Sequence, residues 1–362
     1  MTRNVAPTCH PNMSRRAFMG ALAAVAAAPR SFAQTKPAPV NLGAINHTVL
    51  HVTDPARSVE WYQGLFGMPI IGDFEDRVNM RVGDGPAYLT IMKEPVEEAY
   101  WGEVGLALDP IDPLMPADPT GFADVLRQHG LTESEDPGAM EFSLTMRGPE
   151  SGGAPEGTPV LILVDPFGLR YSLTHKLNCG GGGPLGPDCP LTYPVESPLK
   201  TLEINHCTLG ITDTQKGKDF YQSLFDMPIR AYQGDTTPVY TVSGNSTIVL
   251  FDYSNDPNPV FQGISPQMDH TCYALANYDF NRVRQKLSEY GLEDLGDTFR
   301  ASGPLQHYYT SRRPDRGGAP AGSFEIYLTD PDNLVLQVQD VSYCGGGGTN
   351  GEICGTPENP SR

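Results

Sequence analysis

The stretch Trp61-Tyr-Gln-Gly-Leu-Phe-Gly-Met-Pro-Ile70 recurs later in the chain as Phe220-Tyr-Gln-Ser-Leu-Phe-Asp-Met-Pro-Ile229. Each copy follows an Ile-Asn-His tripeptide at the same distance, and later matches keep the same order. These further matches are Ile45–His47 with Ile204–His206, Gly152–Pro155 with Gly317–Pro320, and Asp165–Pro166 with Asp330–Pro331. Matches in one order across two halves predict a tandem duplication of one domain.

The duplication sets the predicted domain boundaries. We expect a first domain over residues 43–189, a Pro-rich linker over 190–201, a second domain over 202–354 and a short tail over 355–362. Two domains also suit a chain of 362 residues.

Hydrophobic periodicity predicts the same elements in both domains. The spacing predicts a strand over 46–52, a helix over 55–66 that begins at a proline, and a helix over 280–290 that ends at Gly291. Its counterpart in the first domain is expected over 122–129. Each domain closes with a predicted hairpin around its Asp-Pro turn. The order strand, helix, strands, given twice per domain, predicts an α+β fold.

Charge excludes two classes of partner. The chain carries 43 acidic residues against 25 Lys and Arg, a formal net charge of −18. A nucleic-acid partner requires a basic face, and an anionic membrane surface attracts basic segments. We therefore expect neither partner, and instead a small-molecule ligand. The sequence leaves open whether the chain forms a homo-oligomer.

The N-terminus has the pattern of an export signal. Arg15 and Arg16 precede an apolar run from Ala17 to Ala28, which is too short to span a membrane. The segment Ser31-Phe32-Ala33 suits signal peptidase cleavage before Gln34. The paired arginines resemble the twin-arginine signal, so we expect residues 1–33 to direct the mature chain to the periplasm or outside the cell. No membrane attachment is expected after cleavage.

Cysteine spacing predicts two local disulfides. Cys179 and Cys189 enclose a Gly-rich loop, and Cys344 and Cys354 enclose its counterpart. In an oxidising compartment each bridge would stabilise its loop by about 3 kcal/mol in the chain-entropy model. Cys207 and Cys272 are expected to stay unbonded and buried.

These patterns together resemble a known superfamily. A strand beginning Asn-His, a helix ending Tyr-Gln-x-Leu-Phe-x-Met-Pro and a closing Asp-Pro turn are similar to the vicinal oxygen chelate group. This group includes glyoxalases, fosfomycin and bleomycin resistance proteins and extradiol dioxygenases. The resemblance implies paired βαβββ units in each domain, whose mixed sheet curls around a cleft.

The resemblance also implies a metal site. Metal-bearing members use a His on the first strand of each unit and a Glu on the last strand. In the second domain these positions fall on His206, His270 and Gln337, with Gln in place of Glu. The weaker first-domain set is His47, Glu103 and Ser172. Two His with a carboxylate suit Fe(II), and Mn or Zn would also fit; the missing carboxylate leaves open that no metal binds.

A partial match to extradiol dioxygenases adds two catalytic candidates. The segment 326–333 follows the pattern of apolar residue, Tyr, two residues and Asp-Pro, with Asn333 in place of Gly. The resemblance gives Tyr327 a role beside a metal-bound phenolate. His307 is a candidate general base or substrate donor. The alternative interpretation of each is structural: core histidines at 206 and 270, a strand amide at 337, a packing Tyr327 and an exposed His307.

Three functions follow. The first is an exported metal-dependent enzyme, most like a ring-cleaving extradiol dioxygenase acting on a small molecule such as an aromatic diol. The second is a metal-free protein that sequesters a small molecule, as bleomycin-resistance members do. The third is a lyase or isomerase of the glyoxalase type. The sequence does not identify the substrate or the metal, or show whether the first-domain cleft is functional.

Overall fold

The computed structural model describes residues 40–108, 119–182, 186, 188–190, 194–254, 258, 261 and 263–362. The predicted export signal over 1–33 lies outside the described residues. None of the described helices is long and apolar enough to cross a membrane.

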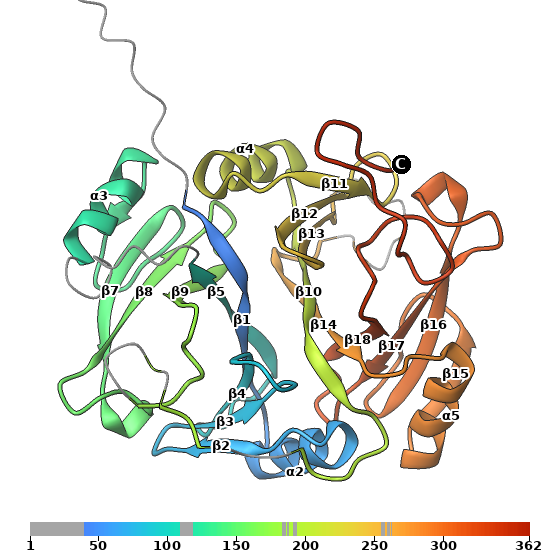
Figure 1. Cartoon of the computed structure of the whole chain (residues 1–362), viewed down its shortest axis with the longest axis horizontal. Helices are drawn as coiled ribbons and strands as arrows, with labels where there is room; N and C mark the ends of the chain where they lie inside the picture. The colour runs from blue at the N-terminus through green and yellow to red at the C-terminus, as the bar shows by residue number, and fades with distance from the viewer. Residues whose placement is uncertain are drawn as a thin grey trace, which may run out of the picture. The chain divides into compact units, whose positions relative to one another are not determined.

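The described chain contains two mixed sheets of nine strands each, one per repeat (Figure 1). The first repeat comprises β1 (Leu42–His51), α2 (Pro55–Phe66), β2 (Ile70–Asp73), β3 (Arg77–Arg81), β4 (Tyr88–Met92), β5 (Tyr100–Leu108), α3 (Pro119–Gln128), β6 (Thr132–Glu133), β7 (Glu141–Arg147), β8 (Thr158–Val164) and β9 (Arg170–His175). The second comprises β10 (Thr201–Ile211), α4 (Thr214–Phe225), β11 (Ile229–Tyr232), β12 (Pro238–Ser243), β13 (Ser246–Asp252), β14 (Gln267–Leu275), α5 (Phe280–Tyr290), β15 (Glu293–Asp297), β16 (Gln306–Arg312), β17 (Ser323–Thr329) and β18 (Val335–Asp340).

The two sheets have the same strand order. The first runs β2-β3-β4-β1-β5-β9-β8-β7-β6, and the second runs β11-β12-β13-β10-β14-β18-β17-β16-β15. Two βαβββ units meet where β1 pairs antiparallel with β5, and β10 with β14. Within each unit the first strand pairs in parallel with the last strand. Parallel strands need a crossover connection, and here the crossover includes a helix. The predicted fold of paired βαβββ units is therefore confirmed.

The repeated helix motif forms α2 and α4 with the same caps and the same buried face. Asp54 and Asp213 accept hydrogen bonds from the third backbone N–H beyond them, which satisfies a free donor of each first turn. Both helices end in a left-handed residue, Gly67 or Asp226. Their buried faces correspond position by position: Trp61, Tyr62, Leu65 and Phe66 in α2, and Phe220, Tyr221, Leu224 and Phe225 in α4.

A single hydrophobic core contains residues of both repeats, and two reciprocal hydrogen bonds connect them. Tyr62 of α2 donates to Asp330 in the closing turn of the second repeat at 3.1 Å. Tyr221 of α4 donates to Asp165 in the closing turn of the first at 2.7 Å. Both carboxyls are buried, so burial raises the pKa of Asp165 to about 6 and that of Asp330 to about 7. The duplicated Tyr and Asp thus hold the repeats together rather than serving the clefts.

Both predicted disulfides are present. Cys179 bonds Cys189 and Cys344 bonds Cys354, each with a Cα–Cα separation of 6.2 Å. Cys207 and Cys272 are buried and unbonded, as predicted. The tail after Cys354 returns to the second sheet, where Tyr232 donates its backbone N–H to Ser361.

Candidate functional site

Strand register aligns the candidate residues of the two repeats. In the second sheet His206 pairs with Cys272, which pairs with Gln337, and Thr208 pairs with His270. In the first sheet the same ladder joins His47, Gly105 and Ser172, and Val49 pairs with Glu103. Glu103 therefore corresponds to His270, and Ser172 to Gln337.

The second repeat brings its three predicted ligands together. Gln337 Oε1 lies 2.9 Å from Nε2 of His206 and 2.9 Å from Nε2 of His270. The two imidazole rings are 5.6 Å apart between centroids. All three side chains are at least nine-tenths buried. The site is a compact, desolvated set of two imidazoles and one amide.

Outer hydrogen bonds orient both imidazoles. His206 Nδ1 lies 2.8 Å from Asn205 Oδ1, and the Asn205 amide donates to the Tyr343 carbonyl, so its oxygen faces the ring. His270 Nδ1 lies 2.7 Å from the Asp269 carboxylate. Each Nδ1 therefore carries a proton, and each Nε2 faces Gln337. Metal-ligating histidines have this kind of outer partner.

Electrostatics keep His206 neutral. Burial lowers its pKa well below the ordinary value, and the neighbouring His270 lowers it further. Burial opposes ionisation of Asp269, but the hydrogen bond to His270 and the charge of Arg300 outweigh it and lower the pKa of Asp269 to about 2. An anionic carboxylate thus lies directly behind one imidazole of the site.

The donor set fits a divalent metal. A metal ion that binds two ligand atoms at about 2.1 Å each, at a right angle to one another, holds those atoms about 3 Å apart. Gln337 Oε1 lies at this distance from Nε2 of His206 and from Nε2 of His270. Gln337 Nε2 is buried without a hydrogen-bond partner among the described residues, whereas Gln337 Oε1 faces both imidazoles. The described residues include no group of three or more His, Cys, Asp or Glu that could hold a metal, and the third candidate ligand here is an amide.

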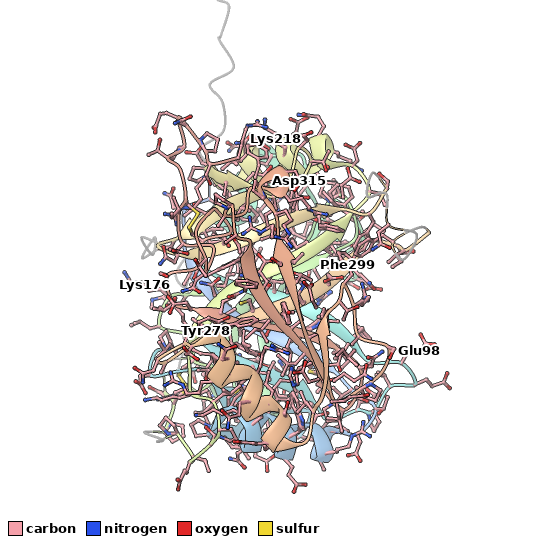
Figure 2. The ribbon with its side chains drawn as sticks, turned by 90° about the vertical axis from the view of Figure 1, so that its right-hand side faces the viewer. Glu98, Lys176, Lys218, Tyr278, Phe299 and Asp315 are labelled. Carbon is pink, nitrogen blue, oxygen red and sulfur yellow. A yellow bond between two sulfur atoms is a disulfide. The ribbon has the colours of Figure 1, made fainter. Side chains whose placement is uncertain are left out.

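A cavity of about 270 Å³ opens beside these three side chains. Its walls are rich in aromatic rings, with arginines and carboxylates around them. The lining includes Phe251, Phe261, Phe299, Tyr308, Tyr327, Arg300, Arg313, Asp315 and Arg316. Phe299 and Asp315, labelled in Figure 2, are exposed and belong to the outer part of this lining. The cavity can therefore accept a flat apolar molecule next to the imidazoles.

The first repeat has a cavity of similar volume but different chemistry. His47 Nε2 lies 3.2 Å from Ser172 and 3.6 Å from Glu103, and Arg170 donates to Glu103 at 3.1 Å. Burial lowers the pKa of His47, although Glu103 opposes the shift. Burial also opposes ionisation of Glu103, yet His47, Ser172 and Arg170 together lower the pKa of this carboxyl. The carboxylate is already neutralised by protein groups.

Comparison with known proteins agrees with this architecture. Residues 44–147 match the model of the Glyoxalase/Bleomycin resistance protein/Dioxygenase superfamily. Residues 44–147 thus belong to this superfamily, and the second repeat has the same strand order. No curated protein matches the chain in sequence.

Several solved structures share the fold. The Mn(II)-bound glyoxalase from Novosphingobium aromaticivorans is 14% identical, with a TM-score of 0.55 over 83% of this chain and 82% of that one. Homoprotocatechuate 2,3-dioxygenase from Brevibacterium fuscum, in complex with 3,4-dihydroxyphenylacetate, is 16% identical, with a TM-score of 0.55 over 84% and 82%. The enzyme from Arthrobacter globiformis is 16% identical, with a TM-score of 0.56 over 85% and 83%. At these identities the likeness concerns the fold.

Tyr327 lies in the cleft of the second repeat, next to His270. Its ring is perpendicular to that of His270, with 5.4 Å between centroids, and it stacks on Tyr308. Its hydroxyl donates to Glu325 at 3.2 Å. Burial raises the pKa of Tyr327 well above its ordinary value, so the phenol keeps its proton.

His307 does not lie in the cleft. Successive side chains of a strand point to opposite faces, and Tyr308 is the residue of β16 that lines the cavity. His307 is fully buried on the other face, where its Nε2 lies 2.8 Å from Ser288 of α5. Both the predicted catalytic role and the alternative of an exposed strand histidine are therefore wrong for this residue.

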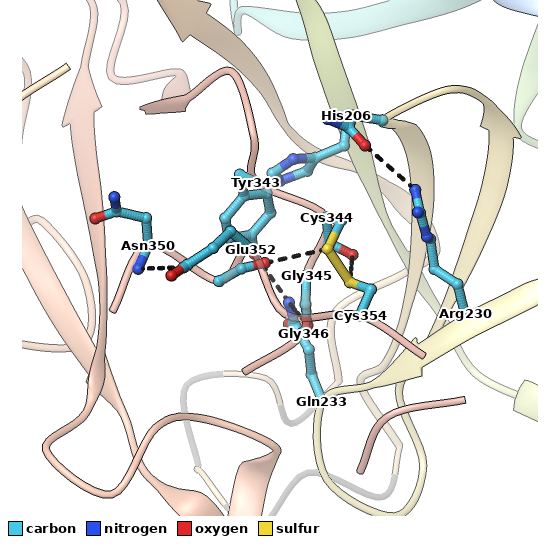
Figure 3. The surroundings of a disulfide bond; sticks show 12 residues. His206, Arg230, Gln233, Tyr343, Cys344, Gly345, Gly346, Asn350, Glu352 and Cys354 are labelled. Atoms are coloured by element: carbon cyan, nitrogen blue, oxygen red, sulfur yellow. Dashed lines mark hydrogen bonds between the residues drawn. A yellow bond between two sulfur atoms is a disulfide. The ribbon is translucent and has the colours of Figure 1, made fainter. Parts of the chain in front are cut away.

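The sequence analysis missed a buried ion pair in the cleft. Arg312 donates to Glu325 at 3.0 Å, and Tyr343 donates to the same carboxylate at 2.9 Å. Tyr343 also stacks on His206 and directly precedes the Cys344–Cys354 disulfide (Figure 3). Comparison of the two repeats could have indicated the arginine but not its partner. Arg147 occupies the position of Arg312 in the first repeat, whereas Val160 occupies the position of Glu325.

Proposed function

We propose that the second repeat is the active site of an exported, metal-dependent enzyme, most like a dioxygenase that cleaves the ring of a small aromatic diol. The convergence of His206 Nε2, His270 Nε2 and Gln337 Oε1 carries this proposal. The aromatic cavity beside them supports a flat substrate. Fe(II) suits two imidazoles with one oxygen ligand, and Mn or Zn would also fit.

A bound metal would supply Lewis acidity, orienting vicinal oxygens of the substrate and stabilising negative charge that develops on them. The chain's own residues have separate tasks. Asp269 and Asn205 hold the protons of the two Nδ1 atoms and so keep each Nε2 available. Tyr327 keeps its phenolic proton and lies next to His270, so it can donate to a substrate oxygen there by turning that proton away from Glu325. The stacked Tyr308 and the phenylalanines exclude water from the ring.

Export is part of the proposal. Two local disulfides suit an oxidising compartment, as does the paired-arginine segment ahead of an apolar run. Intact-mass measurement of exported protein should give a mature chain that begins at Gln34. An exported chain that keeps residues 1–33 would contradict this processing.

One observation favours the second candidate, a metal-free binding protein. Rotation of the Gln337 amide by half a turn would direct its NH₂ group at both imidazoles, so that each N–H donates to one Nε2 lone pair. That arrangement satisfies the site without a cation, because a neutral amide replaces the expected carboxylate. The cavity would then sequester a small molecule.

Metal analysis of the purified mature protein separates the two candidates. We expect about one Fe, Mn or Zn per chain, lost in His270→Ala and kept in His47→Ala, the matched change in the first repeat. A metal-free protein that still binds a catechol in the second-repeat cavity would support sequestration instead. Metal kept in His270→Ala would place the ion elsewhere. If metal is confirmed, oxygen uptake with catechols distinguishes a dioxygenase from the glyoxalase-type lyase or isomerase.

A further inference from the structure

The cavity of the first repeat contains an arginine without a carboxylate partner. Arg147 lines this cavity, whose volume is about 270 Å³. Its Nε is buried and forms no hydrogen bond, and its Nη2 lies only 3.4 Å from the Gly181 carbonyl and 3.5 Å from Asn178 Oδ1. Among the described residues no Asp or Glu forms an ion pair with it. The guanidinium thus retains donors for an anion.

The equivalent arginine in the second repeat shows what is missing. Arg312 is held by Glu325, and this pair is buried. Strand pairing places Val160 at the position of Glu325 and Ile162 at that of Tyr327. The two changes remove the acid that would neutralise Arg147 and make the adjoining wall apolar.

The other charges of the cavity are compensated or exposed. Arg77 is paired with Asp76, and Arg170 with Glu103. The remaining acid, Glu150, is exposed to solvent. The buried Thr174 hydroxyl also lines the cavity and lacks a partner among the described residues. The unmatched groups inside the cavity are therefore hydrogen-bond donors, with a guanidinium among them.

We propose that this cavity binds a small organic carboxylate. The carboxylate would pair with the Arg147 guanidinium, whose fork matches two oxygens, and accept from the Thr174 hydroxyl. The apolar body would lie on Val160 and Ile162. This site is separate from the second-repeat cleft, so the inference does not depend on the proposed metal.

Calorimetric titration of the mature chain tests the site with 3-methylbutanoate, its neutral amide and inorganic phosphate. We expect one molecule of 3-methylbutanoate per chain, with at least tenfold weaker binding of the amide and of phosphate. Arg147→Gln should weaken carboxylate binding at least tenfold. Val160→Glu should do the same, because it gives Arg147 the acid that Arg312 has. Arg127→Gln, which removes an exposed guanidinium from the same repeat, should change the affinity less than twofold.

Three results would overturn the proposal. The first is equal affinity for the acid and the amide. The second is unchanged affinity in Arg147→Gln and Val160→Glu variants whose circular dichroism matches that of the parent. The third is binding that survives Arg147→Gln but is lost in Arg300→Gln, which would assign the ligand to the second-repeat cavity. Phosphate binding more tightly than the carboxylate would contradict the role of the apolar wall.

Discussion

The two clefts share one scaffold but distribute charge in opposite ways. In the second repeat the arginine is neutralised by Glu325, and two imidazoles face an amide oxygen. In the first repeat the candidate ligand Glu103 is hydrogen-bonded to Arg170, and Arg147 has no acidic partner among the described residues. A few substitutions on equivalent strands therefore separate a site suited to a cation from one suited to an anion.

The scaffold retains the position of the first-strand histidine in both clefts. Asn46 donates to the Asn178 carbonyl at 2.7 Å, and Asn205 donates to the Tyr343 carbonyl at 3.0 Å. In each case the amide oxygen faces Nδ1 of the following histidine. Orientation is thus common to the two repeats, and the difference in chemistry comes from the neighbours of Nε2.

The largest expected effect on stability comes from replacing Glu325 of the second repeat by valine, the residue at the equivalent position of the first repeat. Glu325→Val leaves the buried Arg312 guanidinium and the Tyr343 hydroxyl without their acceptor. Breaking a buried pair in this way costs roughly 3–5 kcal/mol. Urea denaturation should show this loss in the free energy of unfolding.

The matched change in the first repeat should be mild. Arg147→Met removes a guanidinium that has no ion pair, so we expect a loss of less than about 1 kcal/mol. The double variant Glu325→Val/Arg312→Met should recover most of the stability lost in Glu325→Val. Equal losses in Glu325→Val and Arg147→Met would contradict the difference drawn between the two arginines.

A second expected difference concerns the buried acids between the repeats. Burial raises the pKa of Asp330 to about 7 and that of Asp165 to about 6; nearby Asp332 adds to the first shift, and Lys216 opposes the second. Both values exceed the unfolded value, so the folded state binds the proton more tightly. The stabilisation is complete below about pH 4 and is lost as pH rises through the folded pKa.

Replacement of each aspartate by asparagine measures its contribution to the pH dependence of stability. Between pH 5 and pH 8 the parent should lose about 2.7 kcal/mol more stability than Asp330→Asn, and about 1.4 kcal/mol more than Asp165→Asn. Chemical denaturation at the two pH values gives these differences. Parallel pH profiles for the parent and both variants would show that the acids are not protonated in the fold.

Much of the architecture could be predicted from the sequence because the repeat supplies its own alignment. The bounds of α2 and α5 and both disulfides follow from periodicity, caps and spacing, and the paired βαβββ units follow from the family resemblance. The convergence of His206, His270 and Gln337 follows from the family resemblance, and their side chains do lie together.

The errors come from the facing of strands and from charges brought together in space. His307 was assigned to the cleft on its chemistry alone, but alternation along β16 directs Tyr308 there instead. Arg312 and Glu325 lie on neighbouring strands, and their pairing depends on the register of those strands. This register cannot be deduced from the sequence alone. Asp165 and Asp330 were read as turn residues, whereas their carboxyls join the repeats.

The smallest expected effect tests the amide that distinguishes this cleft. Gln337→Glu completes a set of two imidazoles and one carboxylate, so attraction to a divalent ion increases. We expect Mn(II) affinity to rise about tenfold, or about 1.4 kcal/mol, measured by competition with a chelator. Ser172→Glu should bring no such gain, because Arg147 and Arg170 line the same cavity and would neutralise the new acid. If Gln337→Glu leaves the affinity unchanged, Gln337 does not face the ion, and its amide donates to both imidazoles of a metal-free cleft.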